Sequence, residues 1–402
     1  MPKANQLKTK RETHKWNTQQ EEIFEFVETQ VAPLLRSLIV QARAGTGKTT
    51  TIVEVAHRLK GHSVLFCCFG KGTQQELQKR LPSSTDAKTF HSIGLSGLKS
   101  AFPLIEINFS KGSQIITRLC KDHGDLWKYR GNLKRLVGLA KATLVDDTKG
   151  LTRLAEAYQL DDNSHMPATR LAMFAFRCLE ESASNTLEAD FDDMCWLPYK
   201  LDLAPRQYDI VIVDEVQDTN ANQQWLVKHS LRPGGVIIAV GDERQAIYQW
   251  RGAGAGVMQG LKDEFSAHEL LLPVTYRVPK SGVEVCNQWV PDFEAGPQND
   301  QGIVRDVGVG QMLVEVKPGD FILSRKNAPL LTVCLALIEA NKPATIAGKD
   351  IATSLIKLAQ KSKTRSTSDM LVWLDDYCSK AAKRLAEADQ EDALQELLDQ
   401  AG

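Results

Sequence analysis

Short apolar runs separated by helical patterns dominate the first part of the chain. Five of these runs have the length and composition of buried strands: residues 37–42 (SLIVQA), 63–69 (SVLFCCF), 208–215 (YDIVIVDE), 234–242 (GGVIIAVGD) and 320–325 (DFILSR). Amphipathic patterns typical of helices follow the first two runs, at 49–60 and 74–81. Because strands joined by crossover helices pair in parallel, this alternation predicts an α/β fold with a parallel sheet.

The pattern changes between about residues 95 and 205. Helical periods occur at 113–124, 132–144 and 168–182, and no clear strand interrupts them. We therefore expect residues 96–204 to be a helical insertion between strands of one sheet. Six basic residues in its first half fit a solvated helix face and a nucleic-acid contact equally well: Lys121, Lys128, Arg130, Lys134, Arg135 and Lys141.

Composition narrows the class of protein. A chain of 402 residues with 43% hydrophobic and 25% charged residues is long enough for two or three globular domains. Its net charge of -1 argues against a surface that binds polyanions everywhere and leaves room for a local basic patch. The eight cysteines include no C-x-x-C pair, so neither a zinc site nor a thioredoxin-like pair is indicated, and a reducing cytoplasm fits.

No segment of the chain indicates a membrane or a secretion signal. The longest apolar run, at 330–338, is too short to span a bilayer. Residues 1–15 are basic but have no apolar core, so we interpret them as a basic tail.

The segment 41–51, QARAGTGKTTT, has the context of a phosphate-binding loop, because it follows a predicted strand and opens a helix. Backbone amides of such a loop can surround a phosphate chain. Lys48 would place its ammonium on the outer phosphates, and Thr49 would hold Mg²⁺. A chance loop is the alternative. The residues expected to line the ATP site are Ala42, Arg43, Ala44, Gly45, Thr46, Gly47, Lys48, Thr49 and Thr50.

One position of this segment departs from the strict pattern G-x-x-x-x-G-K-[ST]. Ala42 stands where the first glycine is expected. Alanine is no steric obstacle there if its φ angle stays negative.

Two carboxylates follow the buried strand at 208–213. Asp214 and Glu215 must emerge at the edge of the sheet, because an unpaired buried carboxylate is costly. In an open α/β sheet this edge is also where ligands bind. Asp214 suits a Mg²⁺ partner, and Glu215 suits a base that orients and deprotonates water. An Asp-Glu pair alone is common at surfaces, but together with the phosphate loop it favours a nucleotide hydrolase.

Seven short stretches, taken in order, resemble the UvrD/Rep-like branch of superfamily 1 DNA helicases. They are WNTQQ, AGTGKTT, FGKGTQQEL, TFHSIG, VDEVQD, VGDERQAIYQWRG and LPVTYR. The resemblance as a whole covers residues 16 to about 330. The resemblance implies a P-loop NTPase with a RecA-like lobe at 16–95 and 205–275. It also implies that residues 276–350 form the start of a second RecA-like lobe. The implied activity is movement in the 3′-to-5′ direction on single-stranded DNA, or on a duplex with a single-stranded tail. The implied cofactors are ATP and Mg²⁺.

The resemblance also assigns roles to individual residues. Gln20 would read adenine and Tyr276 would stack on it, whereas Gln245 and Arg277 would contact the γ-phosphate. The catalytic set is therefore expected to be Lys48, Thr49, Asp214, Glu215, Gln245 and Arg277, with Thr49 and Asp214 at the metal. The residues expected at DNA are Phe69, Lys71, Thr89, His91, Tyr248, Trp250 and Arg251.

Two of the expected DNA contacts have an ordinary structural alternative. Trp250 is the better stacking candidate, since every base offers a π-face, although a buried core tryptophan is the alternative. His91 alone would more often be a structural histidine, and only its setting in TFHSIG favours DNA.

Four positions depart from the family pattern, namely Gly70, Arg244, Ala246 and Thr275. None of these changes removes an essential functional group, so we expect them to affect only the exact positions of the side chains at those sites.

The late motifs of the family, of the types T-x-H-x-x-K-G-L-E and Y-V-A-x-T-R, do not occur between residues 330 and 402. We expect residues 351–402 to be a helical segment of the second-lobe insertion. Three interpretations remain: a truncated motor, a regulatory ATP- and DNA-binding module that needs a second polypeptide, and one part of a helicase–nuclease assembly.

Overall fold

The computed structural model describes residues 15–162, 164–246, 256–324, 328–346 and 373. The chain divides into two compact units, residues 1–303 and 304–402. The predicted basic tail at 1–15 and the predicted helical segment at 351–402 lie almost entirely outside the described residues.

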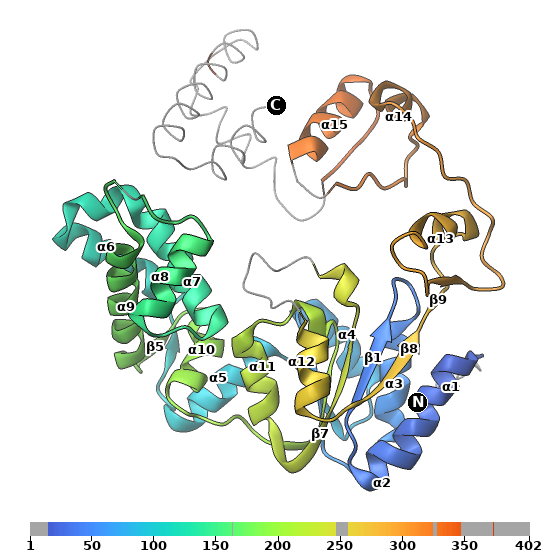
Figure 1. Cartoon of the computed structure of the whole chain (residues 1–402), viewed down its shortest axis with the longest axis horizontal. Helices are drawn as coiled ribbons and strands as arrows, with labels where there is room; N and C mark the ends of the chain where they lie inside the picture. The colour runs from blue at the N-terminus through green and yellow to red at the C-terminus, as the bar shows by residue number, and fades with distance from the viewer. Residues whose placement is uncertain (1–14, 163, 247–255, 325–327, 347–372, 374–402) are drawn as a thin grey trace, which may run out of the picture. The chain divides into compact units, whose positions relative to one another are not determined.

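Six strands form one sheet in the first unit (Figure 1). Every pair is parallel, in the order β3-β2-β6-β7-β1-β8, which confirms the predicted α/β fold. The strands come from both sides of the predicted insertion: β1 (Leu38–Ala42), β2 (Val64–Cys68), β3 (Thr85–Thr89), β6 (Tyr208–Val213), β7 (Leu231–Gly241) and β8 (His268–Leu272). Four of the five predicted strands correspond to β1, β2, β6 and β7.

The two edge strands, β3 and β8, were not predicted from the sequence. Their sequences are TDAKT and HELLL, and both are only partly buried. A central strand is covered on both faces and pairs on both sides, so its sequence is a continuous apolar run. An edge strand has one free side and carries polar residues, so its sequence resembles that of a loop.

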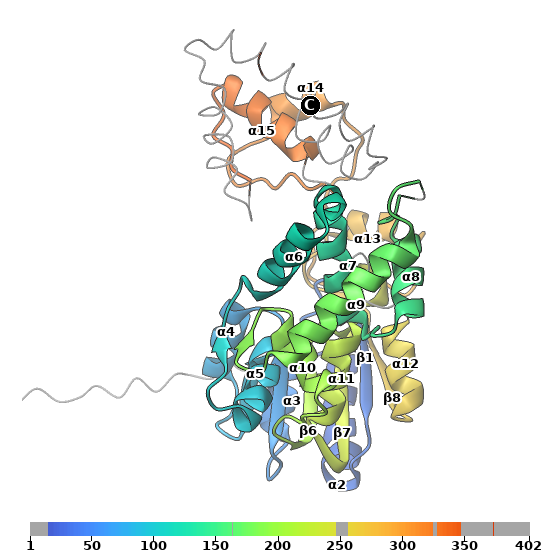
Figure 2. The same cartoon turned by 90° about the vertical axis from the view of Figure 1, so that its left-hand side faces the viewer.

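Helices cover both faces of the sheet (Figure 2). On one face, a core that includes Ile23, Ile52 and Leu77 lies under three helices: α1 (Thr18–Phe26), α3 (Lys48–Arg58) and α4 (Lys71–Arg80). On the other face, a core that includes Ile93 and Leu226 lies under four helices: α5 (Phe90–Ala101), α10 (Asp193–Lys200), α11 (Ala221–His229) and α12 (Val257–Glu264). A π-helical turn η1 (Val27–Val31) and the short α2 (Ala32–Leu34) connect α1 to β1.

Residues 96–204 carry their own helical core, packed around residues such as Leu133 and Leu171. The helical elements are α6 (Lys111–Asp122), the 3₁₀ turn η2 (Gly124–Tyr129), α7 (Arg130–Thr143), α8 (Thr148–Ala157) and α9 (Ala168–Ser184). The expectation that this region holds no strand is wrong in one detail, because β4 (Glu106–Ile107) pairs with β5 (Glu188–Ala189). Strands of two residues are too short to leave an apolar pattern.

The remaining elements of the first unit are small. The 3₁₀ turns η3 (Val216–Asp218) and η4 (Glu243–Gln245) follow β6 and β7. After β8 come β9 (Val274–Thr275), α13 (Lys280–Cys286) and β10 (Glu294–Ala295), and β9 pairs with β10.

The predicted strand at 320–325 is wrong for its described residues, 320–324. They form no strand, and the side chains of Phe321 and Leu323 are 89% and 88% exposed. A strand needs a hydrogen-bonded neighbour, and the described part of the second unit contains only helices, α14 (Val309–Glu315) and α15 (Ala328–Glu339). An apolar run without such a neighbour does not become a strand.

A buried ionic cluster lies inside the helical core of residues 96–204. The Nζ atom of Lys111 donates to Asp193 Oδ2 at 2.8 Å, and that of Lys141 donates to Asp193 Oδ1 at 2.7 Å. Asp190 approaches Lys141 at 3.4 Å, and the Ser182 hydroxyl donates to Asp193 at 2.9 Å. Burial by itself raises the pKa of Asp193, but Lys141 and Lys111 outweigh it, so the pKa is lowered.

This cluster corrects one expectation. Lys141 is buried beside Asp193 and belongs neither to a solvated face nor to a nucleic-acid contact. The other five basic residues of the predicted patch, from Lys121 to Arg135, are exposed.

Replacing Asp193 with alanine should destabilise the first unit strongly. The substitution leaves two buried ammonium groups with one carboxylate fewer, a loss of about 3–5 kcal/mol in the free energy of unfolding. Urea denaturation followed by tryptophan fluorescence would measure it. Glu264→Gln is the matched control, because it breaks the exposed Lys228–Glu264 ion pair (2.6 Å) and should cost less than about 1 kcal/mol. Equal losses in the two variants would contradict the interpretation.

Candidate functional site

The loop between β1 and α3 has the backbone of a phosphate cradle. Gly45 and Gly47 have φ angles of 73° and 81°, which L-residues with side chains rarely adopt. A Cβ atom on Gly45 would lie 2.6 Å from the Cβ of Arg277. The Thr46 hydroxyl donates to the carbonyl of Arg43 at 2.9 Å and fixes the turn. Helix α3 then begins at Lys48, so its free N–H groups face the loop.

The other residues predicted for this loop lie where the pattern places them. Ala42 closes β1 in extended backbone, so the missing glycine causes no clash. Ala44 lies in the turn, and Thr49 and Thr50 lie in the first turn of α3.

The two strand-end carboxylates lie against this loop. Lys48 Nζ donates to Glu215 Oε2 at 2.6 Å, and Thr49 Oγ1 donates to Asp214 Oδ2 at 3.4 Å. Glu215 is turned toward Lys48 by a left-handed backbone, with φ of 51°. Burial raises the pKa of Asp214 to about 6; the charge of Glu215 adds to the rise and that of Lys48 opposes it.

The donor set at this point fits Mg²⁺. The Thr49 hydroxyl and the Asp214 carboxylate are hard oxygen ligands 3.4 Å apart. Among the described residues no group of three or more His, Cys, Asp or Glu side chains gathers to hold a metal. Two protein oxygens are typical of Mg²⁺ sites in which waters and substrate phosphates complete the shell.

The predicted adenine-side residues also meet at the loop. Gln20 Nε2 donates to Thr51 Oγ1 at 2.8 Å, in the second turn of α3. The amide of Tyr276 donates to the carbonyl of Gly45 at 2.9 Å. Asn17 joins the two, because it forms a capping box with Gln20 and donates from Nδ2 to the Tyr276 hydroxyl at 2.7 Å.

The role of Asn17 was missed by sequence reasoning. Its position three residues before Gln20, at the start of a helix, is the signal of a capping box. Thr275, one of the departures from the family pattern, also has a local role. Its Oγ1 accepts from the amides of Arg277 (3.2 Å) and Val278 (3.3 Å), so it fixes the turn that carries Arg277.

A chain of hydrogen bonds connects Glu215 to Gln245. Gln217 Nε2 donates to Glu215 Oε2 at 2.9 Å, and Gln217 Oε1 accepts from the amide of Asp242 at 3.0 Å. Gln245 Nε2 then donates to Asp242 Oδ2 at 2.6 Å. Gln217 and Asp242 were not predicted as site residues, although each stands just beyond the end of a central strand.

The predicted DNA-side residues follow the carboxyl ends of β2 and β3. Phe69 is 41% exposed and meets Phe90 edge-on, with ring centroids 5.1 Å apart. Lys71 is exposed at the start of α4. Thr89 has a structural task as well, because its side chain caps α5 by accepting from the amide of Ser92 at 3.2 Å.

His91 stacks on Phe191, a residue that sequence reasoning missed. Their ring centroids are 3.7 Å apart, and Phe191 is 51% exposed. Burial lowers the pKa of His91 to about 4, so its ring is neutral at neutral pH. Tyr248, Trp250 and Arg251 lie outside the described residues.

The glycine loop, the carboxylates at the strand ends and the parallel sheet define a RecA-like P-loop fold. Residues 16–266 match the family model of the UvrD/REP helicase N-terminal domain. The chain belongs to this family.

Relatives of the chain are named as helicases. It is 27% identical over 286 residues to a probable DNA helicase II homolog of Mycoplasma genitalium, covering 62% of this chain and 40% of that protein. It is 24% identical over 397 residues to the ATP-dependent DNA helicase PcrA of Leuconostoc citreum, covering 81% and 49%. The ATP-dependent DNA helicase Rep of Buchnera aphidicola is 25% identical over 250 residues, covering 54% and 36%. The chain thus spans half or less of the length of these relatives.

Within the described ranges, no helix combines the length and the apolar character needed to cross a membrane.

Asp214 should make the stability of the first unit depend on pH. A carboxyl whose pKa is raised by folding contributes stability that is present below its ordinary pKa and lost as the pH rises through about 6. Between pH 5 and 7 the wild type should therefore lose about 1 kcal/mol of unfolding free energy relative to Asp214→Asn. Urea denaturation of both proteins at the two pH values measures this change. A difference between the proteins that is the same at both pH values would refute the assignment.

Proposed function

We propose that the chain binds and hydrolyses ATP and couples hydrolysis to movement along single-stranded DNA. One observation carries the proposal. Polar contacts run without a break from Lys48 through Glu215, Gln217 and Asp242 to Gln245. Gln245 shortly precedes Tyr248, Trp250 and Arg251, which are expected at DNA. A contiguous network of hydrogen bonds is one physical means by which two sites are coupled.

The roles in ATP chemistry follow from the geometry of the loop. Lys48 and the first amides of α3 would bind the phosphates, and Thr49 and Asp214 would hold Mg²⁺. When bound, Mg²⁺ neutralises the charge that develops on the phosphates. Glu215 would orient a water molecule and accept its proton at Oε2. Glu215 Oε2 accepts from Lys48 in the structure, and this contact lowers the basicity of the carboxylate. Movement of the Lys48 ammonium from Glu215 to the phosphates would free Oε2 for this step.

The remaining ATP-site roles rest on the family resemblance, and for Tyr276 and Arg277 also on placement beside Gly45. Gln20 and Tyr276 would contact adenine, and Gln245 and Arg277 would meet the γ-phosphate. Movement in the 3′-to-5′ direction and a second lobe that begins at 276–350 are supported by the resemblance alone. A cytoplasmic location agrees with the cysteines of the described residues, which are all free thiols.

A row of aromatic rings supports the DNA side of the proposal. Phe69, His91 and Phe191 lie at the carboxyl ends of adjacent strands or stack on residues there. Exposed aromatic rings are stacking platforms for single-stranded nucleic acid, and the exposed Lys71 adds a charge for the phosphates. Tyr248, Trp250 and Arg251 complete the proposed set.

The second candidate is an ATP- and DNA-binding module that depends on another polypeptide, such as a helicase or nuclease subunit. It retains the alternative that the sequence leaves open. Unwinding of a tailed duplex by the chain alone separates the candidates, since a dependent module would bind ATP and DNA without unwinding.

Replacing Lys48 with alanine should reduce ATP hydrolysis by about 100-fold or more, because a preorganised positive charge at the phosphates is lost. A coupled-enzyme assay measures the rate, and circular dichroism checks that the fold is intact. Lys228→Ala, which removes a lysine of the exposed Lys228–Glu264 pair, is the matched control. Wild-type turnover by Lys48→Ala would overturn the assignment of the loop.

Replacing Phe191 with alanine should weaken binding of single-stranded DNA by about 1–3 kcal/mol and leave the KM for ATP unchanged, because one stacking surface is lost. Fluorescence anisotropy of a labelled oligonucleotide measures the affinity. Leu34→Ala is the control, since Leu34 is a large apolar residue, 61% exposed, on α2 before β1. DNA affinities of the two variants that agree with each other would exclude Phe191 from the DNA site.

A further inference from the structure

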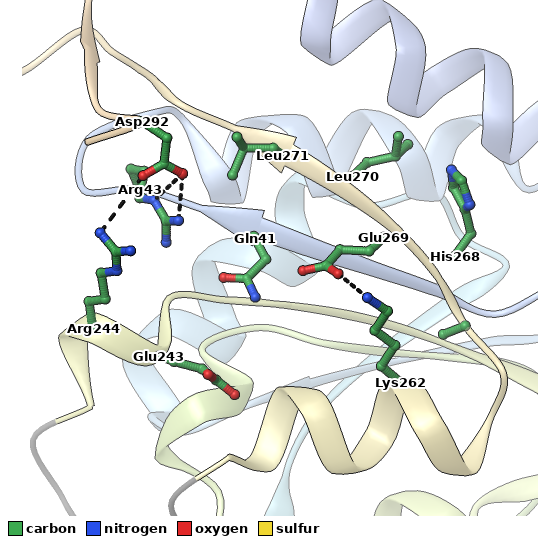
Figure 3. A pocket seen from close by; sticks show the side chains of 11 residues that line it. Gln41, Arg43, Glu243, Arg244, Lys262, His268, Glu269, Leu270, Leu271 and Asp292 are labelled. Atoms are coloured by element: carbon green, nitrogen blue, oxygen red, sulfur yellow. Dashed lines mark hydrogen bonds and ion pairs between the residues drawn. The ribbon is translucent and has the colours of Figure 1, made fainter. Parts of the chain in front are cut away.

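The side chain of Arg43 leaves the phosphate loop and bridges two carboxylates. Its Nη1 donates to Asp242 Oδ1 at 2.9 Å. Its Nη2 and Nε donate to Asp292 Oδ2 at 2.6 Å and 3.2 Å (Figure 3). Arg43 and Asp242 are buried, whereas Asp292 is partly exposed at the rim of an open pocket of about 710 Å³. The guanidinium therefore joins three segments that are far apart in the sequence.

Asp242 is the carboxylate that holds Gln245. Its Oδ2 accepts from Gln245 Nε2 at 2.6 Å, and its Oδ1 accepts from the amide of Arg244 at 3.2 Å as well as from Arg43. A buried carboxylate that loses a charged partner is strongly destabilised and reorients toward water or another donor. The direction in which Gln245 points thus depends on the guanidinium of Arg43.

Asp292 anchors the other end of the bridge. It lies between α13 and β10, and β10 pairs with β9, which immediately precedes Tyr276 and Arg277. A second arginine reaches the same turn, because Arg244 Nη1 donates to the carbonyl of Trp289 at 2.8 Å. The turn 289–292 is therefore held by one residue of the phosphate loop and by one residue next to Gln245.

We propose that Asp292 and Arg43 are positioning residues for Gln245. Asp292 holds the guanidinium of Arg43, Arg43 holds the carboxylate of Asp242, and Asp242 holds the amide of Gln245. A displacement of the turn 289–292 is then transmitted to Gln245 without a change in the phosphate loop itself. This inference rests on the proposed function, in which Gln245 meets the γ-phosphate.

A purely structural ion pair is the competing explanation, and it predicts a different result. Loss of a structural pair lowers stability and leaves the turnover of the folded protein unchanged. Loss of a positioning pair lowers kcat and leaves the KM for ATP unchanged, because ATP binding by Lys48 and the loop amides does not involve Asp292.

The test uses Asp292→Asn, Arg43→Lys and the double variant in the full chain. Asp292→Asn removes the charge at the rim of the pocket without changing the volume of the side chain. Arg43→Lys keeps the charge and removes the fork that reaches both carboxylates. Glu264→Gln, which breaks the exposed pair with Lys228, is the control.

We expect each single variant to lower kcat for ATP in the presence of DNA by about tenfold, and Asp292→Asn to leave the KM for ATP within about twofold of the wild type. The double variant should be no slower than the slower single variant, because both changes break one bridge. Amide hydrogen exchange at residues 242–246 should be faster in Asp292→Asn and unchanged in Glu264→Gln.

The inference would be overturned if the fold-decrease in kcat of the double variant equalled the product of the two single decreases. A kcat of Asp292→Asn equal to that of Glu264→Gln would overturn it too. Unchanged hydrogen exchange at residues 242–246 would overturn it as well. Failure of the proposed function is recognised separately, since wild-type protein would then hydrolyse no ATP. In that event the exchange measurement alone decides whether the bridge positions Gln245.

Discussion

The parallel direction of the six strands is the constraint on which the rest of the structure depends. Because the strands run the same way, the carboxyl ends of β1, β2, β3, β6 and β7 meet at one edge of the sheet. Segments separated by more than 150 residues thereby become neighbours, as the 2.6 Å contact between Lys48 and Glu215 shows. No single segment contains the site. Its residues come from the several loops that follow the carboxyl ends of these strands.

Charge pairing governs how these segments are held together. Two sets of opposite charges meet at this edge: Lys48 pairs with Glu215, and Arg43 pairs with Asp242 and Asp292. The cost of removing a charge from water makes such pairs hard to break one partner at a time. The cluster around Asp193 obeys the same rule inside the helical core of residues 96–204, whereas the pairs at the sheet edge join the segments that carry the proposed ATP site.

Much of the fold could be predicted from the sequence, for physical reasons. Strands β1, β2, β6 and β7 are buried on both faces, so their apolar runs identify them, and the glycines of the phosphate loop are required by its backbone. Residues such as Asn17, Asp242, Asp292 and Phe191 could not be assigned in this way, because their roles come from partners distant in the chain. Arg43 and Asp292, for instance, are 249 positions apart. The run at 320–325 shows the converse, since an apolar pattern does not specify a neighbouring strand.

We infer that the phosphate loop and the segment that begins at Gln245 act as one unit. Steady-state ATP hydrolysis by residues 1–402, measured with and without single-stranded DNA, tests this inference. DNA should raise the turnover number, because a DNA contact near Gln245 reaches Glu215 through Asp242 and Gln217. A turnover number that is the same with and without saturating DNA would contradict it.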